Sequence, residues 1–170
     1  MKRRTLVIRG RRRFRVPQHI VRLDKPGTHG WQVRYGGTEK AFFGDHSHDQ
    51  RGAAAALAAA TKELKRRIQK LPAPTGLRRE PHAQKGNALP VGISGPIERL
   101  RKGRNVVEYS YGVTIPRFGL KPTNKTIYIG TENTVTAKKR KEALAKAIEL
   151  RTRAERAYQT AATRAKRAGK

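Results

Sequence analysis

Three residues of types that commonly bind metals, His46, His48 and Asp49, lie within four positions of one another. Imidazole nitrogens and carboxylate oxygens are common protein ligands of zinc. No further ligand follows at a regular spacing, however, and Ser47 or Asp49 also suits the N-cap of the helix that the next residues favour. The sequence therefore favours helix capping at this segment, and it predicts no metal and no cofactor.

Catalysis would require acids, bases or a nucleophile that converge on one site. The chain has no cysteine, and its 12 Asp and Glu residues are scattered over turns and helix faces. Three of them, Glu142, Glu149 and Glu155, are spaced to pair with cations on the last predicted helix. No glycine-rich loop joins a strand to a helix as a phosphate-binding loop would. We therefore expect the protein not to be an enzyme.

The charge of the chain is strongly positive, because 40 Lys and Arg residues face 12 Asp and Glu residues and give a formal net charge of +28. Residues 1–17 hold eight of the cations and no acid, and residues 134–170 hold twelve cations and three acids. Such a charge is typical of proteins that bind nucleic acid. No apolar run approaches the roughly 18 residues that span a bilayer. We expect a cytoplasmic protein with no membrane partner.

Apolar and polar residues alternate over 31–35, which is typical of a half-buried β-strand. Turn-forming residues over 24–30 precede it, so an antiparallel meander is expected. A helix is predicted over 52–71, where apolar residues recur every three or four positions and many are alanine. The helix should cover one side of the sheet (Trp31, Val33 and Phe43) and leave the other side open (Gln32, Arg34, Lys40 and Phe42).

The same order of segments recurs later in the chain, which predicts two folding units of one kind. The second copy has a strand over 111–115, another over 126–130 and a helix from about Thr136. Its predicted core residues are Tyr111, Val113, Ile115, Ile127 and Ile129. The helical stripe that should cover them comprises Leu144, Ile148, Arg151, Ala154 and Tyr158, and fraying is expected beyond about Ala161.

The predicted fold class is α+β, with two small units that each pack a three-stranded antiparallel sheet on one helix. The predicted boundaries are a basic arm over 1–17, a first unit over 18–71, a linker over 72–90, a second unit over 91–160 and a basic tail over 161–170. The long linker should let the two units bind adjacent sites independently. The sequence predicts no oligomeric state.

Several of these segments resemble the AP2 domain family of plant transcription factors and of bacterial and phage proteins. The resemblance covers about 18–71 and 91–158. It rests on an opening Gly-Ile-like pair, an aromatic-x-Val-x-aromatic strand, an aromatic-aliphatic-Gly strand end and an Ala-rich helix. The closest segments are Arg22-Leu-Asp24, His29-Gly-Trp-Gln-Val-Arg34, Gly92-Ile93, Lys102-Gly-Arg104, Tyr128-Ile-Gly-Thr131 and Glu142-Ala-Leu144.

The resemblance implies a sheet whose uncovered face lies in the major groove of DNA. By motif position, the strand contacts fall on Gln32, Arg34, Lys40 and Phe42 in the first copy and on Gly112, Thr114, Thr126 and Tyr128 in the second. Arg can read guanine and Gln can read adenine, whereas Lys and Thr mostly hold phosphates. We therefore expect the first copy to read bases and the second to clamp the backbone.

The full set of predicted DNA contacts joins these strand positions to the basic segments around them. Trp31 shares the phase of Val33 and is expected in the core, so Phe42 and Tyr128 are the better candidates to touch a base. The set comprises Arg3, Arg4, Arg11, Arg12, Arg13, Arg22, Gln32, Arg34, Lys40, Phe42, Arg99, Arg101, Lys102, Arg104, Thr114, Lys125, Thr126 and Tyr128.

The function expected from the sequence is binding of double-stranded DNA in transcription regulation or chromosome organisation, with association to the nucleoid, or to the nucleus in a eukaryote. Two alternatives stay open. Small Arg-rich α+β chains with basic extensions also occur among RNA-binding and ribosome-associated proteins. The protein could also be a DNA-binding adaptor of an integrase or nuclease, with one sheet turned to a protein partner.

Overall fold

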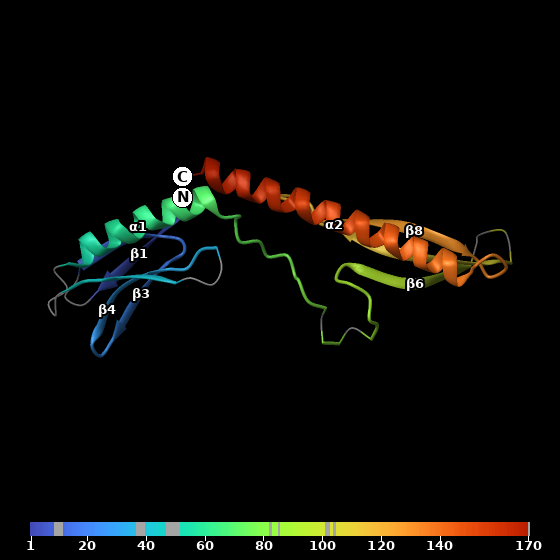
Figure 1. Ribbon diagram of the computed structural model, residues 1–170, viewed down its shortest axis with the longest axis horizontal. Coiled ribbons are helices and arrows are strands. Elements are labelled where there is room, and N and C mark those ends of the chain that lie inside the picture. Colours follow the sequence, from blue (N-terminus) through green and yellow to red (C-terminus); the bar gives the residue numbers. More distant parts are fainter. Residues whose placement is uncertain are drawn as a thin grey trace. The chain divides into compact units, whose positions relative to one another are not determined.

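Figure 1 shows the computed structural model, which describes residues 1–8, 12–36, 40–46, 52–81, 83–84, 86–100, 103 and 105–169. The chain forms two compact units. Unit 1 comprises Met1–Thr75 with Ala162–Lys170, and unit 2 comprises Gly76–Ala161. The described residues form three antiparallel sheets and two helices, which confirms the predicted α+β class.

The central sheet of unit 1 is an antiparallel meander of β3 (Ile20–Lys25), β4 (Thr28–Val33) and β5 (Ala41–Gly44). The helix α1 (Ala53–Lys70) follows and packs against β4 and β5. Trp31 and Val33 are fully buried beneath it. The indole Nε1 of Trp31 donates a hydrogen bond to the carbonyl oxygen of Ala53 at 2.8 Å. The predicted helix and the predicted core side of β4 are therefore confirmed.

The described residues of the predicted basic arm, 1–8 and 12–17, instead form two paired strands, here called the hairpin, that belong to the core of unit 1. β1 (Arg3–Ile8) pairs with β2 (Arg12–Pro17) in antiparallel register. One side of the hairpin holds Leu6, Ile8, Phe14 and Val16, and both Ile8 and Val16 are buried. Successive side chains of a strand point to opposite sides, so the paired strands can bury Ile8 and Val16 on one side while their described arginines remain exposed.

The C-terminal end of the chain also differs from prediction, because α2 (Ala137–Ala168) is helical through the predicted tail and its last turns pack in unit 1. Ala162 is buried. The Arg167 Nε donates to the carbonyl oxygen of Ile68 at 3.3 Å, and the Lys166 Nζ lies 3.2 Å from His19 Nε2. These contacts hold in place a segment that, read as sequence, has little to bury.

The burial of His19, together with its contact with Lys166, is expected to make the stability of unit 1 depend on pH. Burial, and then the Lys166 charge, hold the pKa of His19 below its ordinary value. As the pH falls, the His19 imidazole is therefore protonated in the unfolded chain before it is protonated in the folded chain. The contribution of the neutral imidazole to stability is complete above the unfolded pKa and is lost as the pH falls through the folded pKa. Between about pH 8 and about pH 5.5, we expect the urea midpoint to fall less in His19→Asn than in the original chain.

Asparagine is the suitable replacement because His19 has a φ of 75°, a left-handed conformation that Asn tolerates well. The variant removes the titrating group and keeps this conformation accessible. Parallel pH profiles of the two proteins would show that the pH dependence arises elsewhere in the chain.

Unit 2 contains an antiparallel meander of β6 (Ile93–Leu100), β7 (Val107–Ile115) and β8 (Thr123–Thr131). The helix α2 follows after a turn, and the Thr136 Oγ1 accepts a hydrogen bond from the Lys139 backbone N–H at 3.2 Å. The register shifts between Tyr109 and Ser110, where β8 carries an extra residue opposite β7. The predicted order of three strands and a helix is thus present in each unit.

The core of unit 2 contains Tyr111, Val113 and Ile129, which are buried as predicted, and Ile115 and Ile127, which pack at its edge. The helical stripe differs in part from prediction, since Ile148 is 39% exposed. Alanines cover the sheet in its place. The buried residues that α2 contributes to unit 2 are Ala143, Ala147 and Arg151.

The predicted linker 72–90 contains no helix or strand among its described residues, and the boundary between the units lies inside it, between Thr75 and Gly76. Its first residues pack in unit 1, where the Ala73 N–H donates to Thr163 Oγ1 at 3.1 Å.

Within the described ranges, neither helix combines the length and the apolar character needed to cross a bilayer.

Candidate nucleic-acid interface

The side of the β3–β4–β5 sheet that faces away from α1 carries the predicted contact residues of unit 1. Gln32 pairs with Phe42 across β4 and β5, and Phe42 is 42% exposed. Arg34 is exposed directly after β4, and its Nε donates to the Gln32 Oε1 at 2.7 Å. Lys40 is exposed directly before β5. The structure therefore brings an amide, a guanidinium, an ammonium and an aromatic ring to one uncovered surface.

Gly30 gives the Phe42 ring its place on this surface. A Cβ on Gly30 would lie 2.5 Å from the Phe42 Cζ and 2.3 Å from the Phe43 carbonyl oxygen. Only glycine leaves room for the ring to lie across β4 at this point. In the sequence Gly30 reads as a turn residue, so its position inside a strand was not predicted.

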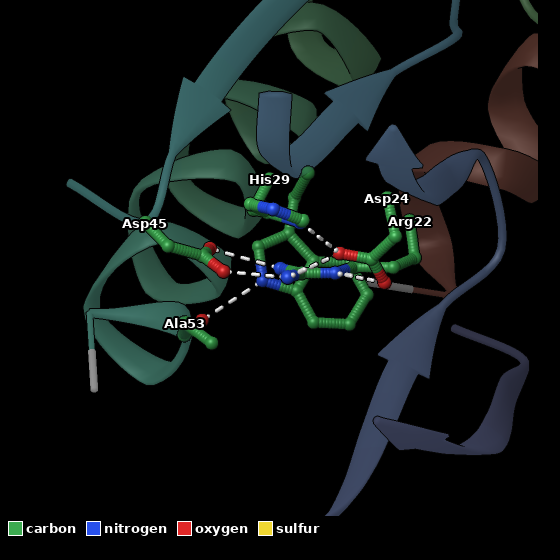
Figure 2. A network of polar contacts seen from close by, with 6 residues as sticks. Arg22, Asp24, His29, Asp45 and Ala53 are labelled. Carbon is green, nitrogen blue, oxygen red and sulfur yellow. Dashed lines mark hydrogen bonds and ion pairs between the residues drawn. The ribbon is translucent and has the colours of Figure 1, made fainter. Parts of the chain in front are cut away.

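Arg22 lies on the opposite side of the sheet, where Figure 2 shows it between Asp24 and Asp45. Its Nη1 and Nη2 donate to Asp45 Oδ1 and Oδ2 at 2.8 and 2.5 Å, and its Nε donates to Asp24 Oδ2 at 3.0 Å. The guanidinium carbon is 5.1 Å from the centre of the Trp31 ring. The Arg22 side chain is 5% exposed and the Asp45 side chain is 0% exposed.

This network is structural, and it corrects the prediction that Arg22 contacts DNA. Arg22 pairs with Trp31 in the β3–β4 register, which directs it toward α1. Its hydrogen bond to Asp24, with further help from His29, holds the pKa of the Asp24 carboxyl below its usual range. The network joins β3, β4 and the end of β5, so it fixes the sheet that presents the open surface.

Of the predicted cluster around His46, the structure describes His46 alone. His46 is exposed with a φ of 53°, and residues 47–51, including Ser47, His48 and Asp49, lie outside the described part of the chain. No group of three or more potential metal ligands occurs among the described residues. Gly52 occupies the N-cap position of α1 in place of the predicted Ser47 or Asp49, and a Cβ there would collide with the Asp45 carbonyl oxygen.

The cations of the hairpin divide between its two sides. Arg3, Arg13 and Arg15 share the outer side and are exposed. Arg4 lies on the other side at the hairpin's end, where its Nη2 donates to the Ile20 carbonyl oxygen at 3.2 Å. Arg12 pairs with Ile8 and is also exposed. Arg15 was not among the predicted contacts, although its alternation with Phe14 and Val16 would have placed it beside Arg13.

The open side of the unit 2 sheet carries few charges. Tyr128, which is 56% exposed, pairs with Ser110, and Thr126 pairs with Gly112. Thr114 lies on the same side of β7 and is half-buried. Arg99 pairs with an acid, Glu108, across β6 and β7. Hydroxyl groups therefore dominate this surface, where the sequence of the second copy places Thr114, Thr126 and Tyr128.

The remaining predicted contacts lie apart from these surfaces or outside the structure. Lys125 pairs with Val113 and so has the phase of the helix-facing side, although it is exposed. Arg11, Arg101, Lys102 and Arg104 lie outside the described residues. The structure thus brings together Gln32, Arg34, Lys40 and Phe42 in unit 1, and Thr114, Thr126 and Tyr128 in unit 2.

Comparison with known proteins adds no relative. No protein-family model matches the chain, and no significant similarity to a curated protein or to a solved structure is found.

Proposed function

We propose that the protein binds double-stranded DNA without catalysing a reaction, and that the β4–β5 surface of unit 1 reads bases in the major groove. The observation that carries the proposal is the uncovered surface of Gln32, Arg34, Lys40 and Phe42 on a sheet whose other side is buried. The net charge of +28 supports a polyanionic partner. Each unit has three antiparallel strands followed by a helix, the order that a resemblance to the AP2 family implies, and this order supports the proposed mode of binding.

The dimensions of the surface suit the major groove. The groove is about 12 Å wide and admits a two-stranded ribbon, and paired strands lie about 4.8 Å apart. Gln32, Arg34, Lys40 and Phe42 lie on the pair β4–β5 or directly beside it. Arg34 and Gln32 already share a hydrogen bond, so each restricts the rotamers of the other before DNA binds. Such preorganisation reduces the entropy lost on binding.

Unit 2 would hold the phosphate backbone through the hydroxyl groups of its open sheet. Hydroxyl groups of Ser, Thr and Tyr contact phosphates more often than they read bases. This division makes unit 1 the reader and unit 2 the clamp. The resulting roles are transcription regulation or chromosome organisation on the nucleoid, or in a eukaryotic nucleus, and an adaptor for an integrase or nuclease would use the same surfaces.

The first test selects bound sequences from a random duplex library in the presence of structured RNA as competitor. We expect duplex DNA to be enriched, and the affinity to fall with salt at a log-log slope of about −0.9 per neutralised phosphate. Preference for the RNA at matched salt would favour the RNA-binding alternative. The exposed Tyr128 would then be the first candidate for stacking on an unpaired base.

Two substitutions at Arg34 separate base reading from charge. Arg34→Lys keeps the charge but loses the planar fork that pairs with guanine. We expect it to keep the affinity for random duplex and to reduce the preference for the selected sequence by about 1–3 kcal/mol. Arg34→Ala should lose the same preference and also some general affinity. An equal loss on selected and random duplexes in both variants would exclude a base-reading role for Arg34.

A further inference from the structure

A second basic surface of unit 1 is a groove between the β1–β2 hairpin and α1. It encloses about 470 Å³, and Arg3 and Arg15 form one wall while Lys62 and Lys65 form the other. Phe14 and Leu57 contribute apolar surface to it. All four cations are exposed, and no acid is among the described residues that line the groove. Arg13 extends the row of cations along the outer side of β2.

The four cations are available to a ligand. Among the described residues, no ion pair or side-chain hydrogen bond involves Arg3, Arg15, Lys62 or Lys65. The neighbouring acid of α1, Glu63, is occupied by Arg66 and Arg67 at 2.6 and 2.7 Å. These two arginines hold the pKa of Glu63 at about 2, so it stays ionised and paired.

The form of the groove suits a polyanion better than a small anion. Its cations are flexible, exposed side chains along two walls, and they do not converge on one point. On the α1 wall, the residues between the lysines and the N-terminus of the helix include Ala54 and Ala58, which keep the surface smooth. Double-stranded DNA carries one negative charge per about 1.7 Å of its axis and matches such an extended surface.

This groove and the Gln32–Phe42 surface lie on opposite sides of the β3–β4–β5 sheet. The hairpin packs on the Trp31 side, as the edge-to-face contact of Phe14 with Trp31 at 5.7 Å shows, and α1 covers the same side. A single straight duplex on the open side therefore leaves the groove uncovered. DNA has a persistence length of about 150 base pairs, so bending it around so small a unit would be costly.

We propose that unit 1 binds two DNA duplexes at once, one on its open sheet and one in the groove of Arg3, Arg15, Lys62 and Lys65. The inference rests on the proposed binding of duplex DNA by the open sheet. The protein then bridges two segments of DNA through one folded unit. We expect the groove to bind any sequence, because its cations are exposed side chains along two walls that can follow the phosphate backbone.

The test measures whether bead-bound duplex captures a second, fluorescent duplex in the presence of the full chain. We expect capture with the original protein and an at least about tenfold loss with Lys62→Gln/Lys65→Gln. The matched control, Lys138→Gln/Lys141→Gln, removes two exposed charges from α2 and should keep the capture. Glutamine has nearly the helix propensity of lysine, and circular dichroism verifies the fold of both variants.

Binding to a single duplex distinguishes the possible failures. The groove variant should retain its preference for the selected sequence, because Gln32 and Arg34 are unchanged. Capture by the groove variant equal to that of the original chain would overturn the proposal, as would a chain that binds one duplex and captures no second. A chain that binds no duplex at all would overturn the proposed function together with this inference.

Discussion

Replacing Asp45 by alanine lowers the free energy of unfolding of unit 1 by about 3–5 kcal/mol, because the substitution leaves the buried Arg22 guanidinium without its main counter-charge. The fluorescence of Trp31 is a suitable measurement, since the chain has one tryptophan and Arg22 stacks on its ring. Unfolding by guanidinium chloride, followed by the fluorescence of Trp31, reports on unit 1 alone.

Asp24→Ala is the matched control, because it removes the second carboxylate bound to the same arginine. The Asp24 side chain is 33% exposed, so water can replace it, and we expect a loss of about 1 kcal/mol or less. Equal losses in the two variants would contradict the assignment of Asp45 as the main partner. If Arg22 were a DNA contact, Arg22→Ala would reduce DNA affinity without any loss of stability.

The second large effect is expected in the hairpin, where Val16→Asp should destabilise unit 1 by about 3 kcal/mol or more. Val16 is 0% exposed, so the substitution places a carboxylate in the apolar core. Val7→Asp introduces the same charge on the outer side of the same hairpin, where Val7 is 60% exposed, and should change stability little. Urea unfolding of both variants measures the difference.

Val7→Asp should affect DNA affinity rather than stability. Val7→Asp places a negative charge directly opposite Arg13 in the hairpin register, so it should weaken binding to random duplex while the fold stays intact. If residues 1–17 were an arm without a fold of its own, both variants would be equally stable and would weaken DNA binding alike.

The parts of the fold that the sequence predicted depend on local periodicity. The alternation of Trp31 and Val33 with Gln32 sets which side of β4 is buried, and the spacing of alanine and leucine in α1 sets the side of the helix that covers it. The same reasoning placed Phe42 and Tyr128 on open sides of their sheets. These assignments required no knowledge of which strands pair.

The errors arose where a residue's environment depends on a distant partner. Arg22 reads as a free cation until the β3–β4 register places it opposite Trp31 and beside Asp45. The charge of residues 1–17 suggested a basic arm, whereas the pairing of β1 with β2 gives this segment one side on which Ile8 and Val16 are buried. The last turns of α2 bury Ala162 only because unit 1 provides a surface for them.

By itself, the sequence determined the class of the protein: an α+β chain with two repeated strand-and-helix segments and a charge suited to a polyanion. Only the tertiary structure decided which cations are committed to the fold and which remain exposed. Arg22 is committed, whereas Arg15, Lys62 and Lys65 gather at one groove although they come from separate elements. The physical reason is that charge and periodicity are properties of the local chain, whereas ion pairs and grooves depend on pairing and packing between distant segments.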